Sequence, residues 1–290
     1  MDVPQTVTPP AVPAVPDDRP VLVIKPTSGW SSLALREVWE YRELAYYMLT
    51  REIKGRYRQM ALGPVWIVLG PLLSIAMNSI IFGSLAKMPS DGIPYPLFNF
   101  AGLLPWNFFM AALNASANSL LNSRGLISKV YFPRLIIPIV GVLGNMVDFA
   151  ISFAIFLGMM LAYGYVPGWG ILLVPVMLLV ASLTGMAVGL WVSSWIVHYR
   201  DVSTLVGYVT RFWMYATPIV YASSVIPDRW LPLYKLNPMN GVVEGFRWAL
   251  LGQGRAPDIY FLVSTLCVLP VLISGMYYFR RSERNIIDIA

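Results

Sequence analysis

The sequence predicts an all-α integral membrane protein. We expect about six transmembrane helices, an N-terminal amphipathic interface helix, and short re-entrant or capping helices between spans 5 and 6. Of the 290 residues, 57% are hydrophobic and 12% are charged, whereas a soluble domain carries roughly 25% charged residues. The apolar runs reach the roughly 20 residues that a spanning helix needs. They lack the strict alternation of a membrane β-barrel strand, and this favours helices.

Residues 1–29 are expected to form a Pro-rich cytoplasmic tail. Seven prolines fall in this stretch, and such a composition favours an extended, mobile chain. The stretch has no apolar core of the length that a secretory signal peptide requires, so we expect none.

Residues 30–58 are predicted to form an amphipathic helix in the plane of the lipid headgroups. Its apolar side comprises Leu35, Val38, Trp39, Ala45, Tyr46, Leu49 and Ile53. Its charged side comprises Arg36, Glu40, Glu43, Arg51 and Lys54, and Arg42 intrudes on the apolar side. The helix either anchors the first span or also meets a cytosolic partner with its polar face.

Residues 59–290 are expected to form the transmembrane permease domain. The charges stop at Arg58 and resume only at Lys87, which marks the entry into the membrane, and Gly63 and Pro64 are expected to bend the chain there. The six spans are placed near residues 62–86, 98–122, 135–163, 171–197, 204–222 and 259–279. Between the last two, Asn237 and Pro238 form a helix start and Gly252 a stop. The helix over 238–251 is too short to cross, so it re-enters the membrane, caps the pore or lies on the surface.

Lysine and arginine are unequally divided between the two sides of the predicted membrane. The side that holds both termini carries 15 of them and the other side carries 5. Because cytoplasmic segments are enriched in these residues, both termini are expected in the cytoplasm of a bacterium, with the chain in its inner membrane. We therefore interpret the net charge of +6 as a signal of topology and expect no nucleic-acid partner.

Motifs for catalysis are missing from the sequence. It contains no Walker A, H-E-x-x-H or G-x-S-x-G pattern, one histidine (His198) and one cysteine (Cys267), so we expect no enzyme and no metal site. Two charged residues, Asp148 and Arg211, fall within predicted spans and are functional candidates because burying a charge is costly. Alternatively, Asp148 hydrogen-bonds a neighbouring helix and Arg211 reaches the membrane surface. A transporter driven by proton movement would need more buried charged groups than these two. The energy for transport is therefore expected to come from another subunit.

Three stretches of the sequence carry a resemblance to a known family. They are R-Y-R-Q-M-A-L-G-P-V-W-I-V-L-G-P-L-L at 56–73, G-L-L-P-W-N-F-F with L-I-S-K-V-Y-F-P-R-L-I-I-P within 102–138, and H-Y-R-D-V, F-W-M-Y-A-T-P-I-V-Y and L-N-P-M-N within 198–240. The chain resembles the six-span permeases of ABC-2-type exporters, specifically those that export lipid-linked polysaccharides such as O-antigens, capsules and teichoic acids.

The resemblance implies a homodimer driven by two separate ATP-binding cassette subunits, which bind ATP and Mg²⁺, so this chain needs no cofactor of its own. It also implies that the segment 123–134 and the loop 198–202 transmit motion from the ATPase, with the interface helix beside it. The residues assigned to this coupling are Arg51, Arg56, Arg124, Lys129, Tyr131, Arg134, His198, Tyr199, Arg200 and Asp201. The alternative for Arg124, Lys129 and Arg134 is that they only mark the cytoplasmic side of the membrane and take no part in coupling.

Aromatic residues are candidates for a sugar channel, because the C–H faces of sugar rings stack on aromatic side chains. The channel set comprises Trp66, Trp106, Phe108, Phe109, Arg211, Trp213 and Tyr215. Tryptophan and tyrosine also gather at membrane interfaces, and we favour this interpretation for Trp106. The outer gate is expected at Pro227, Trp230, Asn237, Pro238 and Arg247.

The predicted function is therefore the transmembrane permease subunit of an ATP-driven exporter that moves lipid-linked polysaccharide across the cytoplasmic membrane, in contact with membrane lipids. One alternative is an ABC-2 exporter of a drug or a small lipid. A membrane-embedded glycosyltransferase or acyltransferase is the other, although Asp148, His198 and Asp201 are widely separated in the sequence.

Overall fold

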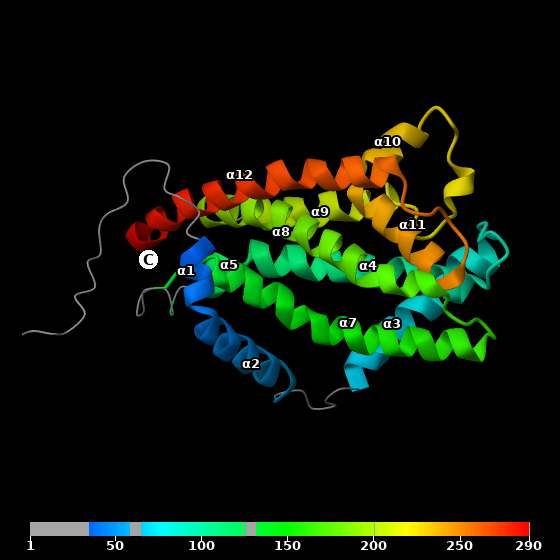
Figure 1. The fold of residues 1–290 in the computed structure, drawn as a ribbon, viewed down its shortest axis with the longest axis horizontal. Helices are drawn as coiled ribbons and strands as arrows, with labels where there is room; N and C mark the ends of the chain where they lie inside the picture. Colours follow the sequence, from blue (N-terminus) through cyan, green and yellow to red (C-terminus); the bar gives the residue numbers. More distant parts are fainter. Residues whose placement is uncertain (1–34, 59–64, 124, 126–131, 200, 290) are drawn as a thin grey trace, which may run out of the picture. The chain divides into compact units, whose positions relative to one another are not determined.

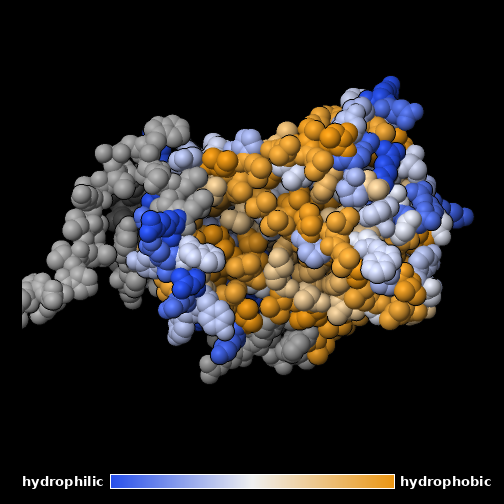
Figure 2. Space-filling view, viewed as in Figure 1, coloured by the Kyte–Doolittle hydropathy of each residue, from blue (hydrophilic) through white to orange (hydrophobic). Residues whose placement is uncertain are grey.

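The computed structural model describes residues 35–58, 65–123, 125, 132–199 and 201–289, without the side chains of 35, 57, 58, 66, 67 and 283–289. This part of the chain is helical and contains no strand. Five of its helices are long and apolar enough to cross a membrane, which confirms the predicted class. Figure 2 shows a broad apolar band between two more hydrophilic ends, as expected for a protein that sits in lipid. The Pro-rich tail and the bend at Gly63 and Pro64 lie outside the described residues.

Two helices, α1 (Leu35–Glu40) and α2 (Arg42–Arg58), occupy the region predicted as one interface helix. Val38, Tyr41, Leu44, Ala45, Met48 and Leu49 pack against a buried cluster of the bundle. The predicted apolar side is therefore partly wrong, because Trp39 and Tyr46 are 72% and 70% exposed. The packed side is rotated toward Glu52 and Arg56, and Arg56 binds Asn145 and Asp148 of the bundle. Local periodicity misplaces this side because the partners of Arg56 lie 89 and 92 residues away in the sequence.

Helix α4 (Tyr95–Ala117) is the centre of the bundle, with α7 (Ile136–Ala162) and α8 (Val174–His198) packed against it. The short helix α5 (Ser119–Asn122) follows α4 (Figure 1). Gly185 and Gly189 bring α8 very close to α4: a Cβ at Gly185 would lie 2.9 Å from the Phe109 oxygen, and one at Gly189 would lie 2.5 Å from Ser116 Cβ. Small residues four apart permit this close approach of two membrane helices.

The first span is less covered by the rest of the chain. It consists of α3 (Val65–Asn78) and a π-helical continuation, η1 (Ser79–Leu85). Pro71 lies inside α3, where it removes one backbone hydrogen bond. Most described side chains of this span are exposed, although Ile75 is buried. The span therefore presents an apolar surface to lipid or to another protein.

Of the last three predicted spans, the fourth agrees with its predicted bounds to within two residues, and the other two depart from theirs. The fourth is η2 (Trp169–Leu173) followed directly by α8. The predicted fifth span, 204–222, is helical only in α9 (Val202–Tyr215). At roughly 1.5 Å per residue these 14 residues extend about 21 Å, less than the hydrocarbon thickness. Helix α12 (Ile259–Ile289) is longer than predicted and packs along α8.

The predicted helix before the last span is confirmed as α11 (Pro238–Leu251). The side chain of Asn237 accepts a hydrogen bond from the Met239 amide, and Gly252 ends the helix with φ of 68°, a conformation that favours glycine. The shorter η3 (Ser223–Val225) and α10 (Leu231–Leu236) precede it. Because α11 is mostly buried and packs on α4 and α8, the surface-helix alternative is wrong.

Candidate functional site

A charged cluster joins α2 to α7. Arg56 donates from Nη1 to Asp148 Oδ2 at 2.6 Å and to Asn145 Oδ1 at 3.0 Å, and from Nη2 to Glu52 Oε1 at 3.0 Å. Asp148 therefore bonds to a neighbouring helix, as one interpretation predicted. It is the thirteenth residue of the 27-residue α7, so α2 ends beside the middle of that helix. An unpaired charge there would be costly in a membrane, and the pairing fixes the end of α2 on the bundle.

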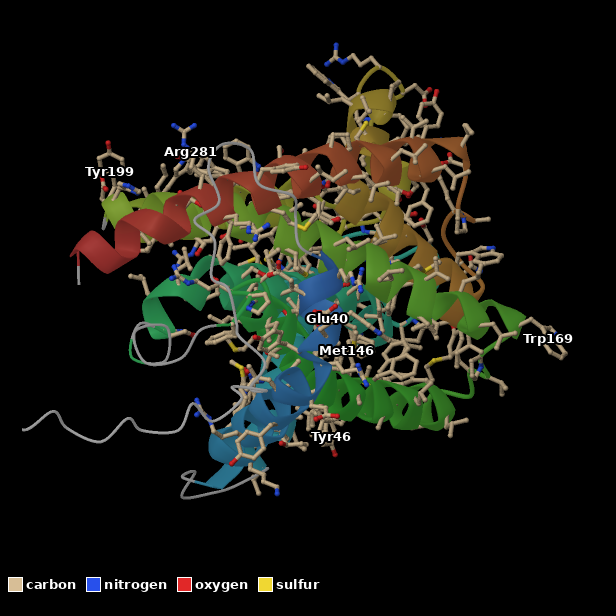
Figure 3. All side chains as sticks on the ribbon, turned by 60° about the vertical axis from the view of Figure 1, so that its left-hand side comes forward. Glu40, Tyr46, Met146, Trp169, Tyr199 and Arg281 are labelled. Carbon is tan, nitrogen blue, oxygen red and sulfur yellow. The ribbon has the colours of Figure 1, made fainter. Side chains whose placement is uncertain are left out.

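The structure describes six of the ten predicted coupling residues. Arg51, His198, Tyr199 and Asp201 are exposed, and Arg134 is half-buried; Arg56 belongs to the cluster above. Tyr199 and Arg281 lie at the same end of the helices, whereas Trp169 projects from the opposite end (Figure 3). Arg124, Lys129, Tyr131 and Arg200 lie outside the described residues.

The predicted channel residues divide into two groups. Trp106, Phe108 and Phe109 are at most 3% exposed, whereas Arg211 and Tyr215 on α9 are exposed. The first group therefore lines no open path within one chain. Trp106 is in the middle of α4 and deeply buried, so the interface-belt interpretation is wrong for it. That interpretation placed Trp106 near the outer end of the second span. Trp66 belongs to α3, and its side chain is outside the described residues.

Trp213 links α9 to α4 and α11. Its ring centroid is 5.0 Å from that of Phe109 and 6.4 Å from that of Trp106. Its Nε1 donates to Asn237 Oδ1 at 3.1 Å, while Asn237 Nδ2 donates to Thr217 Oγ1 at 3.0 Å. Asn237 therefore caps α11 and also holds the C-terminal end of α9. Of the predicted outer-gate residues, Pro227 and Trp230 are exposed and Pro238 begins α11.

Arg247 is a buried cation that donates hydrogen bonds to backbone carbonyls just after the end of α9. Nη1 donates to the Pro218 carbonyl at 2.6 Å, and Nη2 donates to the Ile219 carbonyl at 2.7 Å. Arg247 also donates to Glu244 at 3.2 Å and lies 3.6 Å from the ring centroid of Phe98. Burial lowers the pKa of Arg247 to about 10, although the negative charge of Glu244 raises it in part. The guanidinium therefore remains charged at neutral pH, and it fixes α11, the segment after α9 and α4 together.

The comparison with protein families follows these features along the chain. A model described as the ABC-2 type transporter matches residues 43–251, a range that extends from α2 through α11. The chain belongs to the ABC-2 type transporter family. The resemblance drawn from the three motif stretches is thereby confirmed at the level of the family, and this ABC-2 chain is a membrane permease.

Relatives of this ABC-2 permease include two proteins named O-antigen export system permease protein RfbA. The one from Myxococcus xanthus is 32% identical over 256 residues, which cover 86% of this chain and 96% of the relative. A second, from Klebsiella pneumoniae, is 26% identical over 251 residues, with 85% and 95% covered. The inner membrane transport permease YadH of Escherichia coli is 24% identical over 230 residues, with 73% and 86% covered.

Three residues of the charged clusters were not predicted: Glu52, Asn145 and Glu244. Glu52 precedes Arg56 by four residues and Glu244 precedes Arg247 by three, and these spacings bring charges together on one helical face. This signal was available in the sequence. Asn145 gave no such signal, because its partner Arg56 lies 89 residues away in the sequence.

Proposed function

We propose that this ABC-2 permease carries a lipid-linked polysaccharide outward across the bacterial cytoplasmic membrane. The observation that carries the proposal is the similarity to O-antigen export permeases over nearly the full length of both chains. The related protein YadH, named only as a transport permease, is less similar and covers less of this chain. The polysaccharide substrate is therefore favoured over a drug or a small lipid.

The working unit is proposed to be a homodimer whose two copies enclose the path. Helix α9 exposes apolar side chains, among them Leu205, Val209 and Phe212, together with the charged Arg211. A cation in the middle of a helix is poorly suited to lipid tails. This face therefore suits a second copy or a hydrated path, and the exposed apolar side of α3 adds to the available surface. Tyr215 on the same helix is also exposed, and its ring is proposed to stack on a sugar.

Energy is proposed to come from two ATP-binding cassette subunits, which would hold ATP and Mg²⁺. The exposed His198, Tyr199 and Asp201, together with the exposed Arg51 on α2, would meet them on the cytoplasmic side, where the lysine and arginine distribution predicts both termini. The Arg56 cluster would then transmit movement of α2 to α7, because Arg56 on α2 is bonded to Asp148 and Asn145 on α7 and the two helices would move together.

Deletion of the gene tests this proposal. We expect the surface polysaccharide to disappear and its lipid-linked form to accumulate inside the cell, and a plasmid copy should restore export. Loss of drug resistance with intact surface polysaccharide would instead support a drug exporter. The purified chain is also expected to bind the ATP-binding subunit encoded beside it. Intact surface glycan together with failure to bind that subunit would contradict the proposal.

A further inference from the structure

Two adjoining cavities lie where α11 and α10 meet the start of α12. One is a polar pocket of about 30 Å³ that includes Asn240, Glu244 and Arg255 in its lining. The other is an apolar groove of about 330 Å³ between the first residues of α8 and α12. Pro257, Asp258 and Phe261 line both cavities. A small polar chamber therefore opens beside a much larger apolar one.

One buried acceptor in the wall of the polar pocket has no hydrogen-bond donor among the described residues. Asn240 is 6% exposed, and its Oδ1 has no partner in the described part of the chain, although its Nδ2 donates to the Tyr234 carbonyl at 3.0 Å. Glu244 is also 6% exposed and already accepts from Ser223 and Arg247. A buried acceptor without a partner is destabilising. The volume admits about one small group, and the chemistry favours a donor such as an ammonium.

The rim of the polar pocket is cationic. Arg255 is exposed and has no hydrogen-bond or ion-pair partner among the residues that the structure describes. Lys235 donates to Asp258 at 2.6 Å and lies 4.5 Å from the ring centroid of Tyr260. Burial alone would raise the pKa of Asp258, but the hydrogen bonds from Lys235 and from backbone amides lower it overall, so its charge is retained beside Lys235. The unpaired guanidinium of Arg255 is suited to a phosphate.

The apolar groove faces outward from two predicted spans. Val176 on α8 is 50% exposed, and Ile259 and Leu262 on α12 are 66% and 58% exposed. Both helices meet the length and composition of a membrane span, so the groove is accessible to a lipid tail. Its position is at the end of the helices opposite Tyr199 and Arg281, close to where Trp169 begins the fourth span (Figure 3).

The polar pocket offers a buried acceptor and a free guanidinium, and the apolar groove adjoins it through Pro257, Asp258 and Phe261. A phospholipid with an ammonium headgroup carries a matching group for each feature: ammonium, phosphate and acyl chain. We propose that the cavities form a binding site for phosphatidylethanolamine in the outer leaflet. The ammonium donates to Asn240 Oδ1, the phosphate accepts from Arg255, and one acyl chain lies in the groove beside Val176 and Leu262. This site is separate from the proposed export path on α9.

Native mass spectrometry of the purified full chain tests the site. The probe is an equal mixture of phosphatidylethanolamine and phosphatidylglycerol with the same oleoyl chains. Wild type is expected to retain phosphatidylethanolamine preferentially. Arg255→Gln should weaken its retention about tenfold, because a hydrogen bond to a charged group is lost. Val176→Trp should fill the groove and remove both lipids. The matched control is Arg229→Gln, at an exposed cation that lines neither cavity, and it should bind as wild type does.

Asn240→Asp separates recognition of the ammonium from simple lipid adhesion. The added carboxylate should increase the preference for phosphatidylethanolamine over phosphatidylglycerol. Equal retention of the two lipids by wild type, or no change in Asn240→Asp and Arg255→Gln, would overturn the proposal. So would a purified dimer that binds neither lipid because a second copy covers the groove. The readout is lipid retention by the purified chain, which is independent of polysaccharide export. A negative lipid result therefore does not contradict the proposed export function, and a negative export result does not contradict this lipid site.

Discussion

Replacing Arg247 with methionine should destabilise the protein more than replacing any exposed arginine. The change removes the donors to Pro218 and Ile219, whose carbonyls are bonded at 2.6 and 2.7 Å, and leaves Glu244 without its cation. Breaking a buried ion pair by removing one partner costs about 3–5 kcal/mol. We therefore expect a loss of about 4 kcal/mol in the free energy of unfolding, with Arg229→Met as the exposed control.

A second variant separates the charge from the backbone bonds. In Glu244→Gln/Arg247→Met, no unpaired charge is buried, and the amide oxygen can still accept from Ser223. This double variant should recover about 1–2 kcal/mol of the loss, because the penalty for the unpaired carboxylate disappears while the two carbonyls remain unsatisfied. Glu244→Gln alone gives the fourth corner of the double-mutant cycle.

The free energy of unfolding of all four proteins is measured by reversible unfolding in mixed detergent micelles, with tryptophan fluorescence as the signal. The reasoning would be refuted if Arg247→Met stayed within about 1 kcal/mol of wild type. It would also be refuted if the double variant were as unstable as Arg247→Met, because the buried charge would then contribute nothing.

Three further changes probe the interface helix, the core and the proposed path. Arg56→Gln breaks the bonds to Asp148 and Glu52; each hydrogen bond to a charged group contributes about 1.5–3 kcal/mol. Export should therefore fall while the chain still inserts, and normal export at normal abundance would argue against coupling through α2. Gly189→Leu should disrupt the packing of α8 on α4 and reduce the melting temperature, because a Cβ there already lies 2.5 Å from Ser116 Cβ. Its control is Gly158→Leu, where the space is open, and equal stability of the two variants would contradict the packing. Arg211→Leu should keep the melting temperature but lower export of surface glycan; Arg211→Lys should retain more export, and full export by the leucine variant would remove Arg211 from the path.

Local sequence signals predicted α11 well. Asn237, Pro238 and Gly252 mark its ends chemically, and each acts within a few residues of its own position. The helices themselves were also predictable, because long apolar runs permit few alternatives. The end of α9 at Tyr215 could not be predicted from the local sequence. Its predicted continuation to residue 222 is replaced by a segment whose carbonyls bind Arg247, a residue about 30 positions further along the chain.

The candidate site was harder to predict because burial in this bundle does not follow hydrophobicity alone. Arg247 was expected at an outer gate but lies fully inside, where carbonyls, Glu244 and Phe98 surround it. The helical periodicity of residues 30–58 placed Trp39 and Tyr46 on the packed side. The Arg56 bonds to α7 instead rotate the helix, and a partner 92 residues away is not visible in local periodicity. In both cases a long-range charge interaction overrides the local pattern.

Transport by the reconstituted complex tests the central claim most directly. The purified chain and its ATP-binding subunit would be placed in proteoliposomes with a fluorescently labelled lipid-linked polysaccharide, and the glycan accessible to an enzyme in the opposite compartment would be measured. The account predicts transfer that requires ATP, Mg²⁺ and both proteins, and that falls in the Arg211→Leu variant. A complex that hydrolyses ATP but leaves the polysaccharide in its original leaflet would contradict the account.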